Sequence, residues 1–117
     1  MLAYGTALSA SPPTNEQAGV RTLAASAAPL GAPQELSPGG ASFGPAVLAA
    51  AGNETFLATP EKHGRVLLAT RGAGADRFQG PIALTSIGDG DVVLAAGGSH
   101  VLAAYQEDDR LRLKVIR

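Results

Sequence analysis

The feature that most constrains this chain is an internal repeat with a period of 45 residues. Shifting the sequence by that period superposes Val47–Gly52 on Val92–Gly97 without a gap. A fixed period of about 20 to 50 residues is typical of proteins in which small units stack on one another. Further identities in the same register pair Leu57 with Leu102, Ala58 with Ala103, Arg65 with Arg110 and Leu68 with Leu113.

An earlier, less regular copy precedes these two. Arg21–Ser26 resembles Arg65–Thr70, and Leu30–Ser37 resembles Phe78–Thr85 with a short loop insertion between the two matches. The whole chain therefore reads as a single repeat domain. We expect it to comprise a partial unit over 1–44, a full unit over 45–89 and a partial unit over 90–117.

Each unit has the pattern of four antiparallel strands. In the last copy Leu111, Leu113 and Val115 alternate with cationic residues, which is the period-2 pattern of a strand and not of a helix. Gly52-Asn53 and Gly97-Gly98 are the kind of residue pair that closes a tight hairpin, because glycine accepts positive φ. The strands expected in the full unit cover 46–51, 55–59, 65–71 and 81–86.

Four-stranded antiparallel units at this spacing predict an all-β fold of propeller blades. The chain opens on a pattern that matches a second strand and ends after a third, so its units should contribute three, four and three strands. Ten strands do not close a propeller, which needs at least about four blades. We therefore expect a partial β-propeller that is a fragment of a longer protein, or one that self-associates through open edge strands. A flat β-sandwich and an open meander are the alternatives.

The order of the elements resembles the degenerate propeller-type repeats of bacterial extracytoplasmic proteins. The matching elements are Val47–Ala51, Phe56–Thr59, Arg65–Thr70 and Phe78–Leu84. The resemblance implies a propeller fold and favours a location outside the cytoplasm. The first residues themselves lack the basic and apolar regions of a signal peptide.

The composition excludes several classes of function. Nine Lys and Arg residues against ten Asp and Glu give no basic field for nucleic acid. No stretch approaches the roughly 20 apolar residues of a membrane span. The absence of cysteine excludes disulfides and thiolate chemistry. His63 and His100 are the only histidines and lack clustered ligands, so neither a metal site nor a cofactor is expected.

Five residues are weak candidates for a ligand site. Asp89 and Asp91 precede an inner strand, so in a propeller they would lie at one mouth of the central channel, where ligands usually bind. Arg21, Arg65 and Arg110 recur at one position of the repeat and could clamp a carboxylate or phosphate. Turn formation for the aspartates and a structural ion pair for the arginines are the competing explanations.

No residue pattern points to catalysis. Glu107, Asp108 and Asp109 form an acidic run, but at the tip of a hairpin, where turn geometry explains them. We therefore expect a non-catalytic binding or scaffold module that displays loops to a protein or glycan partner. The alternatives are a fragment of a propeller enzyme that processes glycosides (sialidase-like or a lyase) and a self-assembling lectin. The lectin is disfavoured by the lack of Trp.

Overall fold

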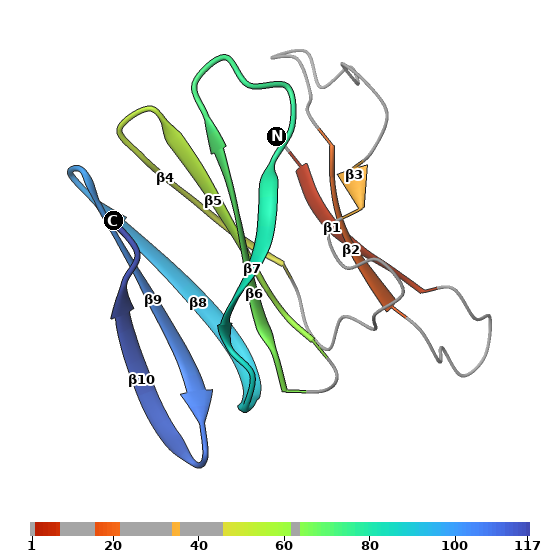
Figure 1. The fold of residues 1–117 in the computed structure, drawn as a ribbon, viewed down its shortest axis with the longest axis vertical. Helices are drawn as coiled ribbons and strands as arrows, with labels where there is room; N and C mark the ends of the chain where they lie inside the picture. Colours follow the sequence, from red (N-terminus) through yellow and green to blue (C-terminus); the bar gives the residue numbers. More distant parts are fainter. Residues whose placement is uncertain (1, 8–15, 22–33, 36–45, 62–63) are drawn as a thin grey trace.

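A computed structural model describes residues 2–7, 16–21, 34–35, 46–61 and 64–117 of the chain. The described residues contain strands and turns but no helix, which confirms the all-β prediction (Figure 1). They form three antiparallel sheets, and in each sheet the strands follow one another in chain order. None of these sheets closes on itself within the described part of the chain.

The strands are named by their order in the chain. The N-terminal sheet comprises β1 (Leu2–Ala7), β2 (Glu16–Arg21) and β3 (Gln34–Glu35). The middle sheet comprises β4 (Val47–Ala51), β5 (Glu54–Pro60), β6 (Val66–Gly72) and β7 (Gln79–Thr85). The C-terminal sheet comprises β8 (Gly88–Gly97), β9 (His100–Glu107) and β10 (Arg110–Val115).

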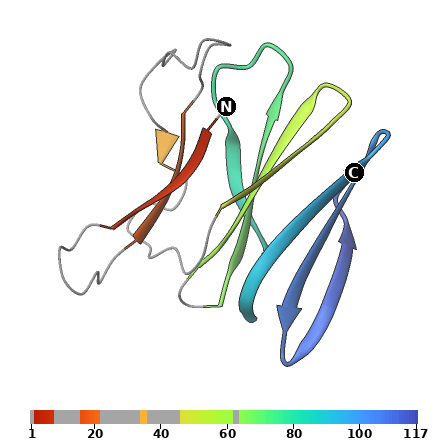
Figure 2. The ribbon, with the colours of Figure 1, turned by 180° about the vertical axis from the view of Figure 1, so that it is seen from behind.

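Both faces of the middle sheet are buried along β5 and β6. Alternate residues such as Phe56 and Leu68 belong to a core shared with the C-terminal sheet, while Leu57 and Ala69 belong to a second core on the opposite face. A strand buried on both faces needs a continuous apolar run, and Val66–Ala69 supplies one. Figure 2 shows the middle sheet lying between the other two.

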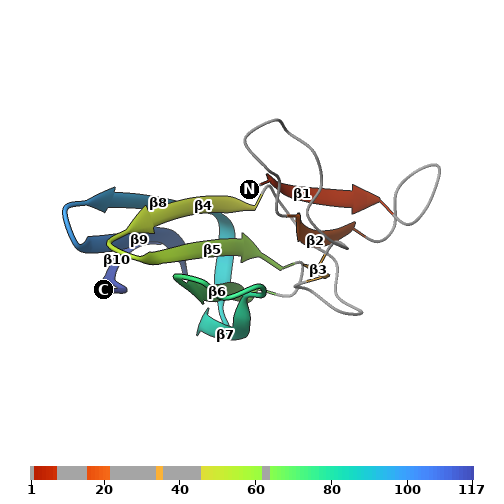
Figure 3. The same cartoon turned by 90° about the horizontal axis from the view of Figure 1, so that it is seen from above.

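The C-terminal sheet packs on the middle sheet through one of its two faces, which we call the inner face. Val92, Val101, Ala103 and Tyr105 point from this face into the shared core. Strand β8 packs against β4 and β5, and Figure 3 shows β8 beside β4. At its beginning, β8 approaches the middle sheet so closely that a Cβ atom on Gly88 would lie 3.0 Å from Cγ2 of Val66.

The N-terminal sheet is joined to the middle sheet by a side chain that imitates strand pairing. The Gln34 side chain accepts a hydrogen bond from the backbone N–H of Phe78 at 2.9 Å and donates one to its carbonyl at 2.9 Å. The Phe78 ring is buried in the second core and lies under the guanidinium of Arg71, 5.6 Å from the ring centroid. The Gln34 side chain therefore fixes β3 to the backbone of Phe78, whose ring packs in the second core of the middle sheet.

The structure corrects one predicted turn. The hairpin β4–β5 turns at Gly52-Asn53 as predicted, because Ala51 pairs with Glu54. The hairpin β8–β9 turns at Gly98-Ser99 and not at Gly97-Gly98, because Gly97 pairs with His100. Of the predicted pair, Gly98 has the positive φ, +62°, that the turn requires. The two tips are thus 46 residues apart, one more than the 45-residue period of the sequence. A shift of one residue moves every side chain of a strand to the opposite face of the sheet.

The first unit also departs from its predicted pattern. The match of Arg21–Ser26 with Arg65–Thr70 predicts a strand that starts at Arg21, but Arg21 is the last residue of β2 and pairs with Leu2. The physical reason is that β1 continues to Ala7, so that Gly5–Ala7 pair with Glu16–Ala18 and β2 begins before Arg21. The other residues expected in that strand, 22–26, lie outside the described part of the chain.

The two-sided burial of β5 makes its apolar residues sensitive to truncation. We expect Leu57→Ala to lower the free energy of unfolding by about 2–5 kcal/mol, because it removes a buried side chain and leaves a cavity. Ile82→Ala, at an exposed position of β7, should change it by less than about 0.5 kcal/mol. Urea unfolding measures both. Equal effects of the two variants would contradict the burial of both faces of the middle sheet.

The two hairpin tips allow the contact between the sheets to be tested. Gly52 and Gly98 both have positive φ, +58° and +62°, so alanine at either should cost about 1 kcal/mol or more. At Gly52 the new Cβ would also lie 3.3 Å from Nη2 of Arg117, whereas nothing lies within 4 Å at Gly98. Gly52→Ala should therefore destabilise the protein more, as measured by urea unfolding.

Arg117→Ala provides the control for this comparison, since it removes the guanidinium that the new methyl would displace. In that background the costs of Gly52→Ala and Gly98→Ala should become equal. A difference that persists without Arg117 would show that this contact between the sheets is not the cause.

Candidate functional site

Most of the residues singled out in the sequence lie at one end of the middle and C-terminal sheets. This polar end, as we name it, consists of the described residues of the β5–β6 connection (61 and 64–65), the β7–β8 connection (86–87) with Gly88 at the start of β8, and the β9–β10 turn (108–109). The connections are joined across the sheets, because the backbone N–H of Gly88 donates to the carbonyl of Gly64. Arg65, Asp91 and Arg110 belong to this end or to the strand starts beside it.

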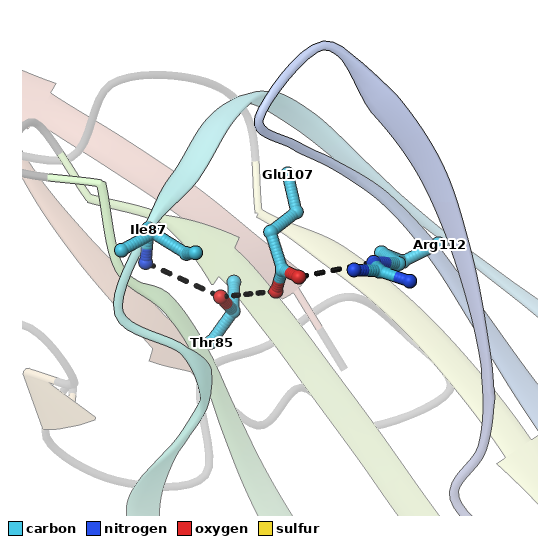
Figure 4. A network of polar contacts seen from close by, with 4 residues as sticks. All are labelled: Thr85, Ile87, Glu107 and Arg112. Atoms are coloured by element: carbon cyan, nitrogen blue, oxygen red, sulfur yellow. Dashed lines mark hydrogen bonds and ion pairs between the residues drawn. The ribbon is translucent and has the colours of Figure 1, made fainter.

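The centre of the polar end is a chain of hydrogen bonds around Glu107, which we call the Glu107 network (Figure 4). The Thr85 hydroxyl donates to Oε2 of Glu107 at 2.6 Å and accepts from the backbone N–H of Ile87 at 3.2 Å. Nε of Arg112 donates to the other carboxylate oxygen at 3.0 Å. Residues from β7 and β10 thereby hold a carboxylate of β9, and 17% of the Glu107 side-chain surface is exposed.

These contacts lower the pKa of Glu107 below its ordinary value of 4.5. The hydrogen bond from Thr85 is the main cause, and the hydrogen bond and charge of Arg112 act in the same direction against the desolvation of the carboxylate. A general acid or base works best when its pKa is close to the working pH. Glu107 is therefore ionised at neutral pH and suited to joining strands, not to transferring protons.

Arg65 has a structural partner within its own connection. Nε of Arg65 lies 2.5 Å from Oε2 of Glu61, whose side chain is only 5% exposed. The backbone N–H of Glu61 also donates to the Arg65 carbonyl at 2.7 Å. An almost buried carboxylate needs such a partner. Arg65 therefore stabilises the β5–β6 connection through its ion pair with Glu61.

Asp89 and Asp91 lie within the first residues of β8, where the strand pairing is irregular. Gly88 pairs with Glu107 and Val92 with Tyr105, so more residues of β8 than of β9 lie between these two pairs. Such a bulge bends the strand and changes the direction of its side chains, and bulges are frequent beside binding sites. Asp91 is exposed. The side chain of Asp89 lies outside the described residues.

The three candidate arginines do not form one site. Arg110 starts β10, is exposed and pairs through its backbone with Glu107. Arg21 pairs with Leu2, near the N mark in Figure 1, at the end of the fold opposite the polar end. The predicted ring of arginines is thus not assembled in the described residues, whereas Arg65, Asp91 and Arg110 do lie at the same end.

The acidic run and the histidines have ordinary local roles. Asp108 and Asp109 are the two turn residues between β9 and β10, with φ of 48° and 58°, a conformation that aspartate tolerates better than most residues. His100 lies 3.1 Å through Nδ1 from the carbonyl oxygen of Arg117. His63 lies outside the described residues. Within the described part, no group of three or more His, Asp or Glu residues could hold a metal ion.

Thr85 and Arg112 were not anticipated from the sequence. Thr85 is separated from Glu107 by 22 positions and belongs to the preceding unit, so no local motif connects the two. The alternation along β10 predicted that Arg112 lies on the polar side of the strand. This pattern was the one sequence feature that bears on its place in the Glu107 network. The structure adds that this side is the inner face of the sheet, because Arg112 pairs with the buried Tyr105.

Comparisons with known proteins found no matching family model, no matching curated protein and no matching solved structure. Among the residues that the structure describes, no helix is long and apolar enough to cross a membrane.

The Glu107 network makes stability depend on pH. Because the pKa of Glu107 is lowered in the fold, its contribution is present above pH 4.5 and is lost as the pH falls through the lowered value. Thr85→Val should remove the main cause of the shift, so the pKa of Glu107 should rise, as an NMR titration of its carboxyl carbon would show. At neutral pH the variant should lose about 1–2 kcal/mol of stability.

Thr70→Val is the matched control, because it removes a hydroxyl from a half-buried position of β6 that does not touch the Glu107 network. It should leave the titration of Glu107 unchanged. An unchanged titration in Thr85→Val as well would contradict the hydrogen bond between Thr85 and Glu107.

Proposed function

We propose that this chain is a non-catalytic binding and scaffold module of the β-propeller type. The proposal is supported by two consecutive antiparallel meanders, the middle and C-terminal sheets, which pack face to face with their hairpin tips 46 residues apart. Stacked meanders of this kind form a rigid frame for exposed connections. The loops of the polar end are the part of the frame that would meet a partner.

The observation that carries the proposal is that the largely buried carboxylates of the polar end are paired with arginines. Glu61 and Glu107 are largely buried, and each is bound to an arginine of its own sheet. Glycoside hydrolysis instead requires a carboxylic acid that is protonated near the working pH. The pKa of Glu107 is shifted in the opposite direction. The two ion pairs are therefore better explained as contacts that hold the scaffold together than as parts of a catalytic centre.

A protein partner fits the described surface better than a glycan. Sugar rings commonly stack on exposed aromatic side chains, whose faces are apolar and whose tips are polar. Phe56, Phe78 and Tyr105 are the aromatic residues whose side chains the structure describes, and all three are buried. At the polar end the exposed groups carry both signs of charge: Asp91 lies on β8, and Arg110 directly follows the turn residues Asp108 and Asp109. Mixed charge favours a polar protein surface as the partner.

Exposed residues available for a partner should contribute little to stability. We expect Asp91→Asn and Arg110→Ala to change the free energy of unfolding by less than about 0.5 kcal/mol. Glu107→Gln, which breaks the Glu107 network at the same end, should lower it clearly. Urea unfolding at neutral pH measures all three. A large loss in Asp91→Asn or Arg110→Ala would mean that these residues hold the fold together and are not free to bind.

The non-catalytic character is tested with a panel of fluorogenic glycosides that includes sialosides and uronides. We expect no turnover above the buffer rate by the purified chain. Hydrolysis that is abolished by Glu107→Gln, with Asp109→Asn as the charge-matched control, would overturn the proposal in favour of a glycoside-processing enzyme.

A further inference from the structure

The C-terminal sheet carries its exposed apolar residues on a single face, the one turned away from the middle sheet. Between 43% and 73% of the surface of each large side chain on this face is exposed. Residues paired directly across neighbouring strands share a face. Two rows therefore cross the three strands side by side, Val93–Ala104–Leu113 and Ala95–Leu102–Val115. Leu111 lies beside Gln106. We define the outer face as Val93, Ala95, Leu102, Ala104, Leu111, Leu113 and Val115.

The two rows that span all three strands carry no charge. The cationic residues of β10, Arg110, Arg112 and Lys114, alternate with its leucines and valine and so point to the opposite side of the strand. Three strands of about six residues cover roughly 300 Å², at about 4.8 Å between strands and about 3.4 Å per residue. Apolar patches of a few hundred Å² on a monomer are commonly interaction sites.

The middle sheet shows what covers a face of this kind. Aligning the two tips, Gly52 and Gly98, places Val47 and Ala49 of β4 on Val93 and Ala95 of β8. Val47 and Ala49 belong to the face of the middle sheet that packs on the C-terminal sheet. In the same way, Ala58 of the shared core corresponds to Ala104. The outer face is therefore the counterpart of a face that the fold covers with another apolar β-sheet.

The edge of β10 is a poorer place for association than the outer face. Arg110, Arg112 and Lys114 occupy every second position of this strand, and charged side chains along an edge oppose pairing with another strand. Arg112 is also held by Glu107. An uncharged apolar face, by contrast, has no charge pattern that opposes a copy of itself, and two-fold pairing of identical surfaces is the commonest form of self-association.

We propose that two copies of this chain pair through their outer faces, sheet against sheet. The inference goes beyond the proposed function, because it requires no partner other than the chain itself. Two such sheets pack about 10 Å apart. The projected area is below the about 800 Å² that each partner buries in an interface of standard size, so the dimer is weak and depends on concentration.

Sedimentation velocity on the purified chain from about 1 µM to about 1 mM tests the pairing. The mass should rise from that of the 11.7 kDa monomer towards twice that value and then stop increasing. Leu113→Glu should remain monomeric over the whole range, because a carboxylate would be buried without a partner. Ile82→Glu is the matched control, since Ile82 is 62% exposed on β7, outside the outer face, and it should associate like the wild type. Circular dichroism and urea unfolding establish that both variants are folded.

The chain lacks cysteine, so single cysteines report the geometry of the dimer. Ala104→Cys lies on the central strand of the outer face and should be joined to its copy by a homobifunctional thiol reagent with a reach of about 10 Å. Lys114→Cys, on the opposite side of β10, should not be joined. A wild type that stays monomeric at the highest concentration overturns the proposal. So do equal association of Leu113→Glu and wild type, and equal cross-linking of the two cysteine variants.

Discussion

The structure depends on the burial of both faces of the middle sheet. Phe56, Ala58 and Leu68 face the C-terminal sheet, while Leu57 and Ala69 face the opposite core, which Phe78 closes. Neither core contains many large side chains, and several positions are occupied by alanine. The strands can therefore approach closely, as at Gly88, and the stability of the fold comes from stacking several thin layers instead of from one large core.

Polar residues fix the relative position of these layers at both ends. At the polar end, Thr85 and Glu107 connect the last strand of one sheet with the second strand of the next. At the other end, Nη1 of Arg117 donates to the Ala51 carbonyl at 3.0 Å and also pairs with Glu54. Hydrophobic packing alone would tolerate sliding of flat apolar faces, whereas these directional bonds define one arrangement. Among the described residues, two of the three ion pairs, Glu107–Arg112 and Glu54–Arg117, take part in these contacts, which supports the proposed scaffold function.

Much of the local structure could be predicted from the sequence, because it is encoded locally. The alternation of Leu111, Leu113 and Val115 gave β10, and Gly52-Asn53 gave the first tip. The choice between Gly97-Gly98 and Gly98-Ser99 could not be made in this way, because both pairs contain a glycine that accepts positive φ. This one-residue ambiguity decides which face of β8 is buried, since Val92 and Val93 are equally apolar.

The candidate site was predicted less well for a similar reason. Arg65 and Arg110 lie at strand starts, as their places in the repeat predicted, and Asp91 lies within β8 instead of before it. The bond between Thr85 and Glu107, however, depends on how two sheets pack. No spacing within one unit reveals it. The predicted position of Arg21 was wrong, because its match with Arg65 places it at the start of a strand, whereas it is the last residue of β2 and pairs with Leu2.

The measurement that tests the central claim most directly is amide hydrogen exchange followed residue by residue, because protection reports the free energy needed to open each strand. If the middle sheet is buried on both faces, the amides of β5 and β6 that are bonded to each other should exchange most slowly. Those of β10 should exchange much faster, since its outer face is exposed. Equal protection of β5 and β10, or greater protection of β10, would contradict the layered arrangement.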